Sequence, residues 1–159
     1  MNFVKFIFAM FLSFLPGILG IIVAPISSGG NLWYNTLNHS LLTPPGWVFS
    51  VAWTILYFLI GLALFFVMQT DNMDRRYNKT TAYVLFAINL VLNTLWSFVF
   101  FGAEMPSVAL LVLVLLIGTV ILMMREFFRI NNVTIWLLLP YLLWLFFAFY
   151  LNAMIIYLN

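Results

Sequence analysis

Five apolar runs, each about as long as a membrane-spanning helix, constrain the fold of this 159-residue chain more than any other feature. A helix needs about 20 apolar residues to cross the hydrocarbon core of a bilayer, whereas a barrel strand needs about 10 residues of alternating character. Hydrophobic residues make up 66% of the chain and charged residues only 6%, whereas roughly a quarter of a soluble domain is charged. The sequence therefore predicts an all-α membrane protein, a bundle of five transmembrane helices.

Short polar segments separate the predicted spans. The second span should begin near Pro45 and Gly46, because proline is favoured in the first turn of a helix. The expected spans cover about residues 5–25, 45–68, 80–101, 108–124 and 133–158. The expected loops include residues 27–31, 69–79, 102–107 and 125–132. Residues 1–159 are thus predicted to form a single transmembrane domain with no separate soluble domain.

The first run, residues 5–25, also fits a secretory signal peptide. Its apolar body is longer than the usual length of about 7–15 residues, and the small residue Ala24 is followed directly by Pro25. A retained helix is therefore favoured over a cleaved one. Pro16 falls near the middle of this span, where a kink is tolerated if neighbouring helices satisfy the carbonyl that proline leaves without a donor.

The basic residues are distributed asymmetrically. With five spans, all six fall on the side that carries the N-terminus: Lys5, Arg75, Arg76, Lys79, Arg125 and Arg129. The positive-inside rule then places the N-terminus in the cytoplasm, and the C-terminus and the Trp33 loop outside. Nucleic-acid binding is not expected, because these residues are few, dispersed and interleaved with acidic ones.

The charged and polar residues disfavour several kinds of chemistry. None of the ten charged side chains lies deep in a predicted span, which disfavours a pump or a carboxylate-driven carrier. The chain has no cysteine and one histidine, His39, so no metal site is expected. The four acidic residues lie in other loops than His39, which disfavours a Ser/His/acid set. We expect His39 to be a loop residue at the interface without a functional role.

Large aromatic and carboxamide side chains form stripes on three predicted helices. Residues three or four apart share one face of a helix. The stripes are Trp53 and Tyr57; Asn89, Asn93, Trp96 and Phe100; and Tyr141, Trp144, Ala148 and Asn152. They should face inward together, because an amide at membrane depth costs free energy unless it is partnered. Ala148, small among bulky neighbours, would leave room for a ligand or for a close helix approach.

Structural roles compete with ligand binding for these residues. Trp33, Tyr34, Trp47 and Trp136 lie where an interfacial aromatic belt is expected, and the belt is favoured for Trp47 and Trp136. Interhelical hydrogen bonding is favoured for Asn89 and Asn152. Three tryptophans lie a turn or more inside their spans, although a packed core is an alternative for them as well: Trp53, Trp96 and Trp144. The residues alone predict a helical bundle with an aromatic, weakly polar cavity for a flat apolar ligand.

Three segments carry a more specific pattern. They are W-Y-x2-L-x6-P-P-x-W-x-F-x3-W-x3-Y from Trp33 to Tyr57, NLVLNTLWSFVFFG from Asn89 to Gly102, and LPYLLWLFFAFYLN from Leu139 to Asn152. Their order and spacing resemble the signature segments of the TspO/MBR family, the tryptophan-rich sensory proteins related to the translocator protein or peripheral-type benzodiazepine receptor. The resemblance spans nearly the whole chain.

The resemblance implies a five-helix bundle in a bacterial cell membrane, often a homodimer, with a pocket covered by the first loop. It implies a tetrapyrrole such as protoporphyrin IX or heme, or a benzodiazepine-like molecule, as ligand, with no required cofactor. Trp53 and Trp144 match tryptophans that face each other across the pocket and are linked to light- and oxygen-dependent breakdown of protoporphyrin IX in bacterial members. They would be the candidate catalytic residues. The expected ligand-binding residues, which combine these matches with the helix stripes, are Trp33, Tyr34, Pro44, Trp53, Tyr57, Asn93, Trp96, Trp144 and Ala148.

The chain departs from the family pattern in three places. Ser50 and Val51 stand where members usually carry Gly-Pro, so a straighter second helix is expected. His39, Ser40 and Leu42 stand where members commonly carry Lys-Pro and a further tryptophan, so charge pairing between the loop and a propionate is not expected. No basic residue follows Tyr150 or Tyr157, so the cholesterol-recognition pattern of animal relatives is missing. Two function classes stay open, a porphyrin-binding sensor or transporter and a photo-oxidative porphyrin-degrading enzyme.

Overall fold

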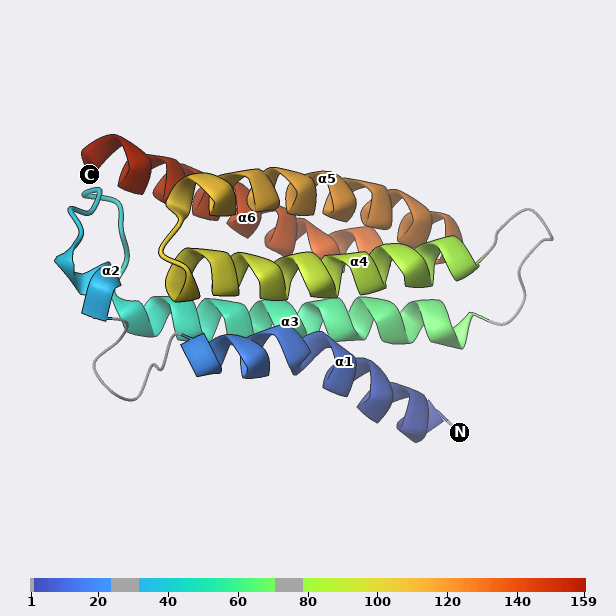
Figure 1. The fold of residues 1–159 in the computed structure, drawn as a ribbon. Coiled ribbons are helices and arrows are strands. Elements are labelled where there is room, and N and C mark those ends of the chain that lie inside the picture. The colour runs from blue at the N-terminus through green and yellow to red at the C-terminus, as the bar shows by residue number, and fades with distance from the viewer. Residues whose placement is uncertain (1, 24–31, 71–78) are drawn as a thin grey trace.

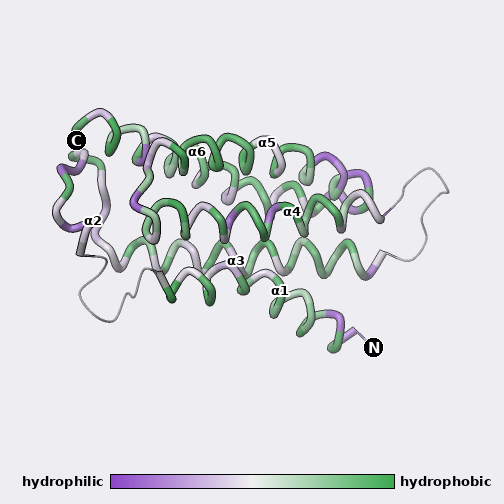
Figure 2. Tube along the Cα trace, in the orientation of Figure 1, coloured by the Kyte–Doolittle hydropathy of each residue, from purple (hydrophilic) through white to green (hydrophobic). Residues whose placement is uncertain are grey.

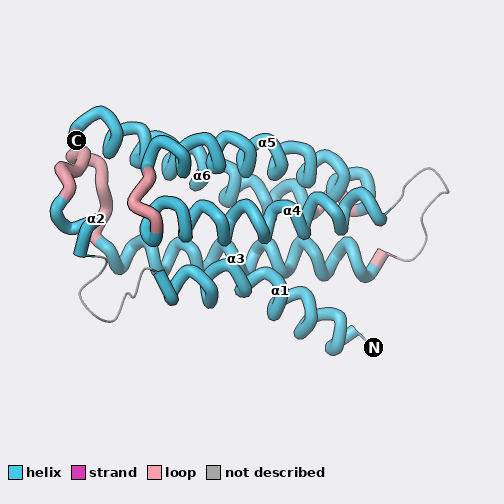
Figure 3. The backbone as a smooth tube through the Cα atoms, viewed as in Figure 1, coloured by secondary structure: helices cyan, strands magenta, loops and turns pink. Residues whose placement is uncertain are grey.

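Five long helices run side by side, and one short helix lies in the first loop (Figure 1 and Figure 3). The computed structural model of the protein describes residues 2–23, 32–70 and 79–159, so the loop predicted at 27–31 and most of that at 69–79 lie outside it. In chain order the elements are α1 (Asn2–Val23), α2 (Leu32–Thr36), α3 (Gly46–Gln69), α4 (Lys79–Ser97), the π-helical turn η2 (Phe98–Gly102), α5 (Pro106–Ile130) and α6 (Thr134–Leu158).

The helices pack as a ring rather than in sequence order. The first helix, α1, packs against α3 and α4, and α3 also packs against α6. Helix α5 packs against both α4 and α6, which closes the ring in the order α1, α3, α6, α5, α4. This order brings α3 and α6, which are distant in sequence, next to each other.

All five long helices are long and apolar enough to cross a membrane. Hydrophobic residues predominate along each of them (Figure 2). A helix that is apolar all round belongs in a core or in lipid. Side chains such as Val91, Leu111 and Leu143 are more than half exposed, as lipid-facing residues are expected to be. The predicted class, an all-helical five-span membrane protein, is confirmed.

The predicted ends of the fourth span and the predicted first loop need correction. The loop expected at 125–132 is helical as far as Ile130, so α5 ends six residues later than predicted, and it starts two residues earlier. Its last turns continue because Phe127 is fully buried and Arg129 donates a hydrogen bond to Glu126 at 2.8 Å. Short helix α2 was not predicted, because its five residues are too few to show a helical period.

The third span ends in a wider turn than a regular helix. The amide of Ala103 donates to the carbonyl of Phe98 at 2.8 Å, a bond that spans five residues. This π-turn belongs to η2, in which Phe100 is buried. Glu104 then adopts a positive φ of 57°, and Pro106 starts α5.

Asn152 joins α6 to the start of α5. With its carboxamide nitrogen turned toward α5, it donates to the carbonyl of Pro106 at 3.0 Å, and its oxygen accepts from the amide of Leu110 at 3.2 Å. Asn152 thus makes the interhelical bonds expected for a buried amide.

The described basic residues gather at one end of the bundle. Lys5 lies near the start of α1, Lys79 begins α4, and Arg125 and Arg129 lie in the last turns of α5, all at the end that carries the N-terminus (Figure 1). The Lys5 ammonium donates to the carbonyl of Met68 at 3.0 Å, where a cation interacts favourably with the C-terminal end of α3. Arg75 and Arg76 lie outside the described residues.

We predict that this basic end faces the cytoplasm, because positively charged flanks are retained on that side. A reporter that folds only outside the cytoplasm should be active when fused after Asn159 and inactive when fused before Met1. Activity of a strictly cytoplasmic reporter at the C-terminus would contradict this orientation.

Candidate ligand-binding site

Two tryptophans from different helices meet at membrane depth. Trp53 and Tyr57 lie one helical turn apart on α3, and their rings stack with centroids 5.3 Å apart and an interplanar angle of 28°. Trp144 of α6 meets Trp53 edge to face at 6.4 Å and 82°. Tyr141, one turn before Trp144, approaches the same Trp53 ring at 6.3 Å. We call Trp53, Tyr57, Tyr141 and Trp144 the paired-tryptophan cluster.

Buried hydrogen bonds connect this cluster to α4. The Tyr57 hydroxyl donates to Oδ1 of Asn93 at 3.3 Å, and Nδ2 of Asn93 donates to the Tyr141 hydroxyl oxygen at 2.9 Å. Nδ2 of Asn89 donates to the same Tyr141 oxygen at 3.0 Å. All four side chains are buried. The two amides therefore find partners without water, and the bonds fix the rotation of α3, α4 and α6 relative to one another.

Glycine allows α1 to approach this cluster closely. A Cβ atom on Gly17 would lie 2.6 Å from Cε2 of Tyr57, well inside van der Waals contact. The absent side chain lets α1 cover the face of Tyr57, which fixes the ring on which Trp53 stacks.

A second aromatic cluster lies toward the first loop. Trp96 stacks on Phe100 at 5.2 Å and 19°, and α2 brings Trp33 to 5.7 Å and Tyr34 to 6.1 Å from the Phe100 ring. Burial raises the pKa of Tyr34, so this phenol stays neutral at physiological pH. We call Trp33, Tyr34, Trp96 and Phe100 the loop-side cluster. Trp96 packs against the main core as well as this one.

Hydrogen bonds attach the first loop to the end of α6. The Asn38 amide donates to Oδ1 of Asn159 at 2.9 Å, and Nδ2 of Asn159 donates to the Asn38 carbonyl at 3.2 Å. The hydroxyls of Ser40 and Tyr150 are 2.9 Å apart. His39 packs on the Tyr34 ring at 4.6 Å, and its Nε2 lies 3.0 Å from the Tyr34 carbonyl oxygen.

Two buried donors are left without partners. The indole N–H groups of Trp96 and Trp144 are buried and have no hydrogen-bond partner among the residues that the structure describes. Such an unmet donor costs about 1–3 kcal/mol, and native structures contain few of them. Each cluster therefore contains one donor for which a ligand with an acceptor atom would supply the missing bond.

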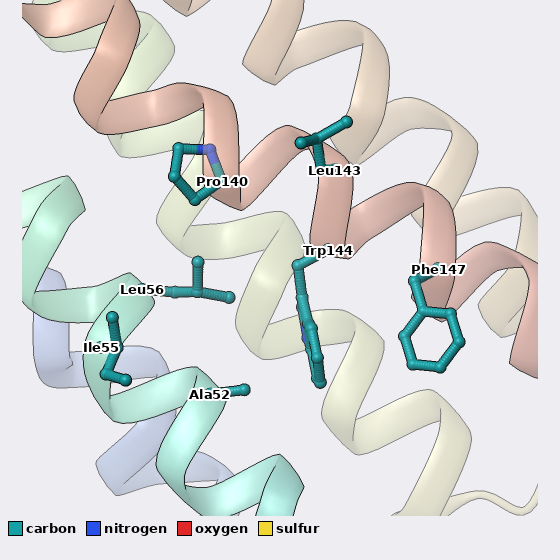
Figure 4. Close-up of a pocket in the computed structure, with 7 residues that line it drawn as sticks. All are labelled: Ala52, Ile55, Leu56, Pro140, Leu143, Trp144 and Phe147. Carbon is teal, nitrogen blue, oxygen red and sulfur yellow. The ribbon is translucent and has the colours of Figure 1, made fainter. Parts of the chain in front are cut away.

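A groove of about 430 Å³ lies against Trp144 between α3 and α6 (Figure 4). Its lining residues are Ala52, Ile55, Leu56, Pro140, Leu143, Trp144 and Phe147. Ile55 and Leu143 at its mouth are 54% and 60% exposed, so the groove opens toward the lipid. Its volume lies in the range of about 300–1,000 Å³ that is typical of small-molecule sites.

Comparison with known proteins identifies the family. The sequence model of the TspO/MBR family matches residues 9–158, nearly the whole chain. This chain belongs to the TspO/MBR family. It is 42% identical over 127 residues to the tryptophan-rich protein TspO of Chlorobaculum tepidum, an alignment that covers 80% of this chain and 79% of the relative.

Two further members of the TspO/MBR family show similar coverage. The tryptophan-rich protein TspO of Archaeoglobus fulgidus is 39% identical over 80% of this chain and 80% of its own length. The tryptophan-rich sensory protein of Cereibacter sphaeroides is 37% identical over 86% of this chain and 82% of its own length.

The residues expected to line one TspO/MBR pocket are divided between the two clusters. Trp53, Tyr57, Asn93 and Trp144 come together, whereas the ring contacts of Trp33, Tyr34 and Trp96 lie in the loop-side cluster. Ala148 is buried in the core one turn after Trp144, and Pro44 is half-buried in the loop before α3. The clusters share the core around Trp96.

Two residues outside the expected set contact members of the two clusters. Tyr141 accepts both buried amide bonds, a role that its place three residues before Trp144 on one helix face could have suggested. His39, expected to have no role, contacts both the ring and the carbonyl of Tyr34. Within the described part of the chain, no three histidine, cysteine, aspartate or glutamate residues form a group that could hold a metal ion.

We predict that Tyr141→Phe lowers the free energy of unfolding by about 1–2 kcal/mol, because it leaves two buried amide donors without their shared acceptor. Equilibrium unfolding in mixed detergent micelles measures this change. Tyr157→Phe is the matched control, since Tyr157 is 81% exposed. An equal loss in both variants would show that the buried network contributes nothing specific.

Proposed function

We propose that this protein binds porphyrins and drug-like apolar ligands such as benzodiazepines at the paired-tryptophan cluster and acts in sensing or transport. The observation that carries the proposal is the stacked pair of Trp53 and Tyr57, with Trp144 meeting Trp53 edge to face inside the apolar spans. A flat macrocycle such as protoporphyrin IX or heme stacks on indole and phenol rings, and its apolar area is buried there. No cofactor is part of the proposal.

Polar groups around the cluster suit the acceptors of such a ligand. The indole N–H of Trp144 has no partner among the described residues and could donate to a carbonyl or a propionate oxygen. The Asn93 amide lies next to Tyr57 and could exchange one of its bonds for a bond to the ligand. A few convergent polar groups in an apolar wall are typical of small-molecule sites.

The loop-side cluster and the attached loop complete the proposed site. Trp33, Tyr34 and Pro44 would cover its outer end, and Trp96 and Ala148 would line the space beneath. The name of the Cereibacter sphaeroides relative, a tryptophan-rich sensory protein, supports a sensing role. The proposed location is a bacterial cell membrane, with the loop outside and the N-terminus in the cytoplasm.

Light- and oxygen-dependent degradation of protoporphyrin IX is a second candidate function. The observation that favours it is the contact between the Trp53 and Trp144 rings, with centroids 6.4 Å apart. A porphyrin beside this pair would contact both oxidisable indoles, one by its ring face and the other by its ring edge. Under this alternative, Trp53 and Trp144 are the catalytic residues, and light and dioxygen are the co-reactants.

We expect protoporphyrin IX to quench the tryptophan emission of the protein, because a bound porphyrin accepts energy from the neighbouring indoles. The Trp53→Phe/Trp144→Phe variant should bind more weakly, by about tenfold or more, since two stacking surfaces become smaller. Trp136→Phe is the matched control, because Trp136 is 72% exposed and lies outside the cluster. Fluorescence titration in nanodiscs measures the affinities.

The same samples separate the two candidate functions. Under light and air, the degrading enzyme should consume porphyrin absorbance faster than the Trp53→Phe/Trp144→Phe variant does. Quenching without this difference would leave binding and remove the enzyme. Absence of quenching in the wild-type protein would remove both.

A homodimer is also part of the proposal. The Leu/Val-rich outer face of α5 offers a broad apolar surface, with Leu111, Val114 and Leu115 each more than half exposed. Close apolar packing of this kind can join helices within lipid. Cross-linking in native membranes should yield a dimer, and recovery of the monomer alone would count against it.

A further inference from the structure

A ligand could approach the paired-tryptophan cluster from two sides. One side is the end of the bundle under the first loop, and the other is the lipid-facing groove between α3 and α6. The loop side is closed by specific contacts, whereas the groove side is open to the lipid. This difference indicates the route by which a ligand enters. The inference rests on the proposed function, because it concerns how a porphyrin-like ligand reaches the same site.

The loop side is closed by specific contacts. Asn38 and Asn159 exchange two hydrogen bonds, and the Ser40 hydroxyl meets that of Tyr150 at 2.9 Å. Beneath the loop, Trp33 and Tyr34 pack on Phe100, which in turn stacks on Trp96. A ligand entering here would have to break these hydrogen bonds and separate the four packed rings.

The groove side is open as far as Trp144. The small side chain of Ala52 on α3 points toward Trp144 on α6 and leaves space between the two helices (Figure 4). Trp144 lines the groove and meets the Trp53 ring at 6.4 Å and 82° in the paired-tryptophan cluster. Trp144 therefore belongs to both the groove and the cluster, and its ring lies between the groove and Trp53.

No hydrogen bond from the described residues holds the Trp144 ring in this position. Its indole N–H is buried without a partner among the described residues, and its ring contacts are those to Phe49, Trp53 and Phe147. Pro140 lies one turn earlier and cannot donate a backbone hydrogen bond to the carbonyl of Trp136, which weakens the helix at this point. A ligand acceptor in the groove would give the indole N–H the partner it lacks once the ring turns outward.

We propose that the groove between α3 and α6 is a lateral entry site, through which a lipid-soluble aromatic ligand with an acceptor atom passes from the bilayer to the tryptophan pair, with Trp144 as the gate. Apolar ligands concentrate in the hydrocarbon phase, so a lipid-facing entrance meets them at their highest concentration. The groove holds the ligand first, the Trp144 ring turns, and the ligand reaches Trp53 while the first loop stays attached to α6.

The test compares a filled groove with a locked loop, with protoporphyrin IX in nanodiscs as the probe. Ala52→Leu fills the groove and should slow porphyrin association by about tenfold. Dissociation should slow by the same factor, because a narrowed route impedes both directions and leaves the Kd unchanged. Ala87→Leu is the matched control, since Ala87 is an exposed residue of α4 away from the groove. Ile55→Ala widens the mouth and should not slow association.

The second experiment locks the first loop to α6 through introduced cysteines. The chain has no native cysteine that could react instead. Asn38→Cys and Asn159→Cys together can be joined by a short thiol-reactive cross-linker, with Asn38→Cys alone as the control. Stopped-flow tryptophan quenching should give the same association rate before and after cross-linking. A slower rate in the cross-linked protein, or an unchanged rate in Ala52→Leu, would overturn lateral entry.

The failure of the proposed function is distinguishable from these outcomes. If wild-type protein shows no quenching by protoporphyrin IX, the binding proposal is wrong and the entry route falls with it. If wild-type protein binds and Ala52→Leu binds with a weaker Kd but an unchanged association rate, binding stands and the groove belongs to the final site rather than to the route.

Discussion

The hydroxyl oxygen of Tyr141 is the point at which the three functional helices are held together. It accepts amide hydrogen bonds from Asn89 and Asn93 of α4, and Asn93 accepts in turn from Tyr57 of α3. In a bilayer these groups cannot hydrogen-bond to water instead. Helix orientations in which an amide would face lipid are therefore unfavourable. Rotating α3, α4 or α6 about its axis would break at least one of these hydrogen bonds. The positions of Trp53 and Trp144, one turn from Tyr57 and Tyr141, follow from this constraint.

Hydrophobic length made the fold predictable. A chain with so few charges must place its apolar runs in lipid, where a helix satisfies its own backbone hydrogen bonds. The number of spans was therefore predictable, and the starts of α3 and α6 were predicted to within one residue. The end of α5 was mispredicted, because Arg125, Glu126 and Arg129 suggest a loop when taken alone. Phe127 shows why they are helical, since the same turn that exposes the charges buries its ring.

The site was predictable only where a single helix determines it. Spacings of three and four residues correctly placed Trp53 with Tyr57, and Tyr141 with Trp144, because that geometry is local. The separation of Trp33 and Tyr34 from the tryptophan pair depends on where α2 and η2 lie, which no period in the sequence encodes. The contact of His39 with Tyr34 depends on the fold of the first loop in the same way. These are tertiary features of short, irregular segments.

The contrast between satisfied amides and unsatisfied indoles separates packing from recognition in this protein. The carboxamides of Asn89, Asn93 and Asn152 hydrogen-bond between helices, so stability accounts for their placement. The indole N–H groups of Trp96 and Trp144 are buried at a net cost, which stability does not explain. A phenylalanine at either position would fill space without that cost, whereas each tryptophan carries a donor for which the described residues supply no acceptor. Sequences violate such local rules mainly at functional sites. The two unpartnered indoles are therefore the observation on which the proposed ligand site depends most.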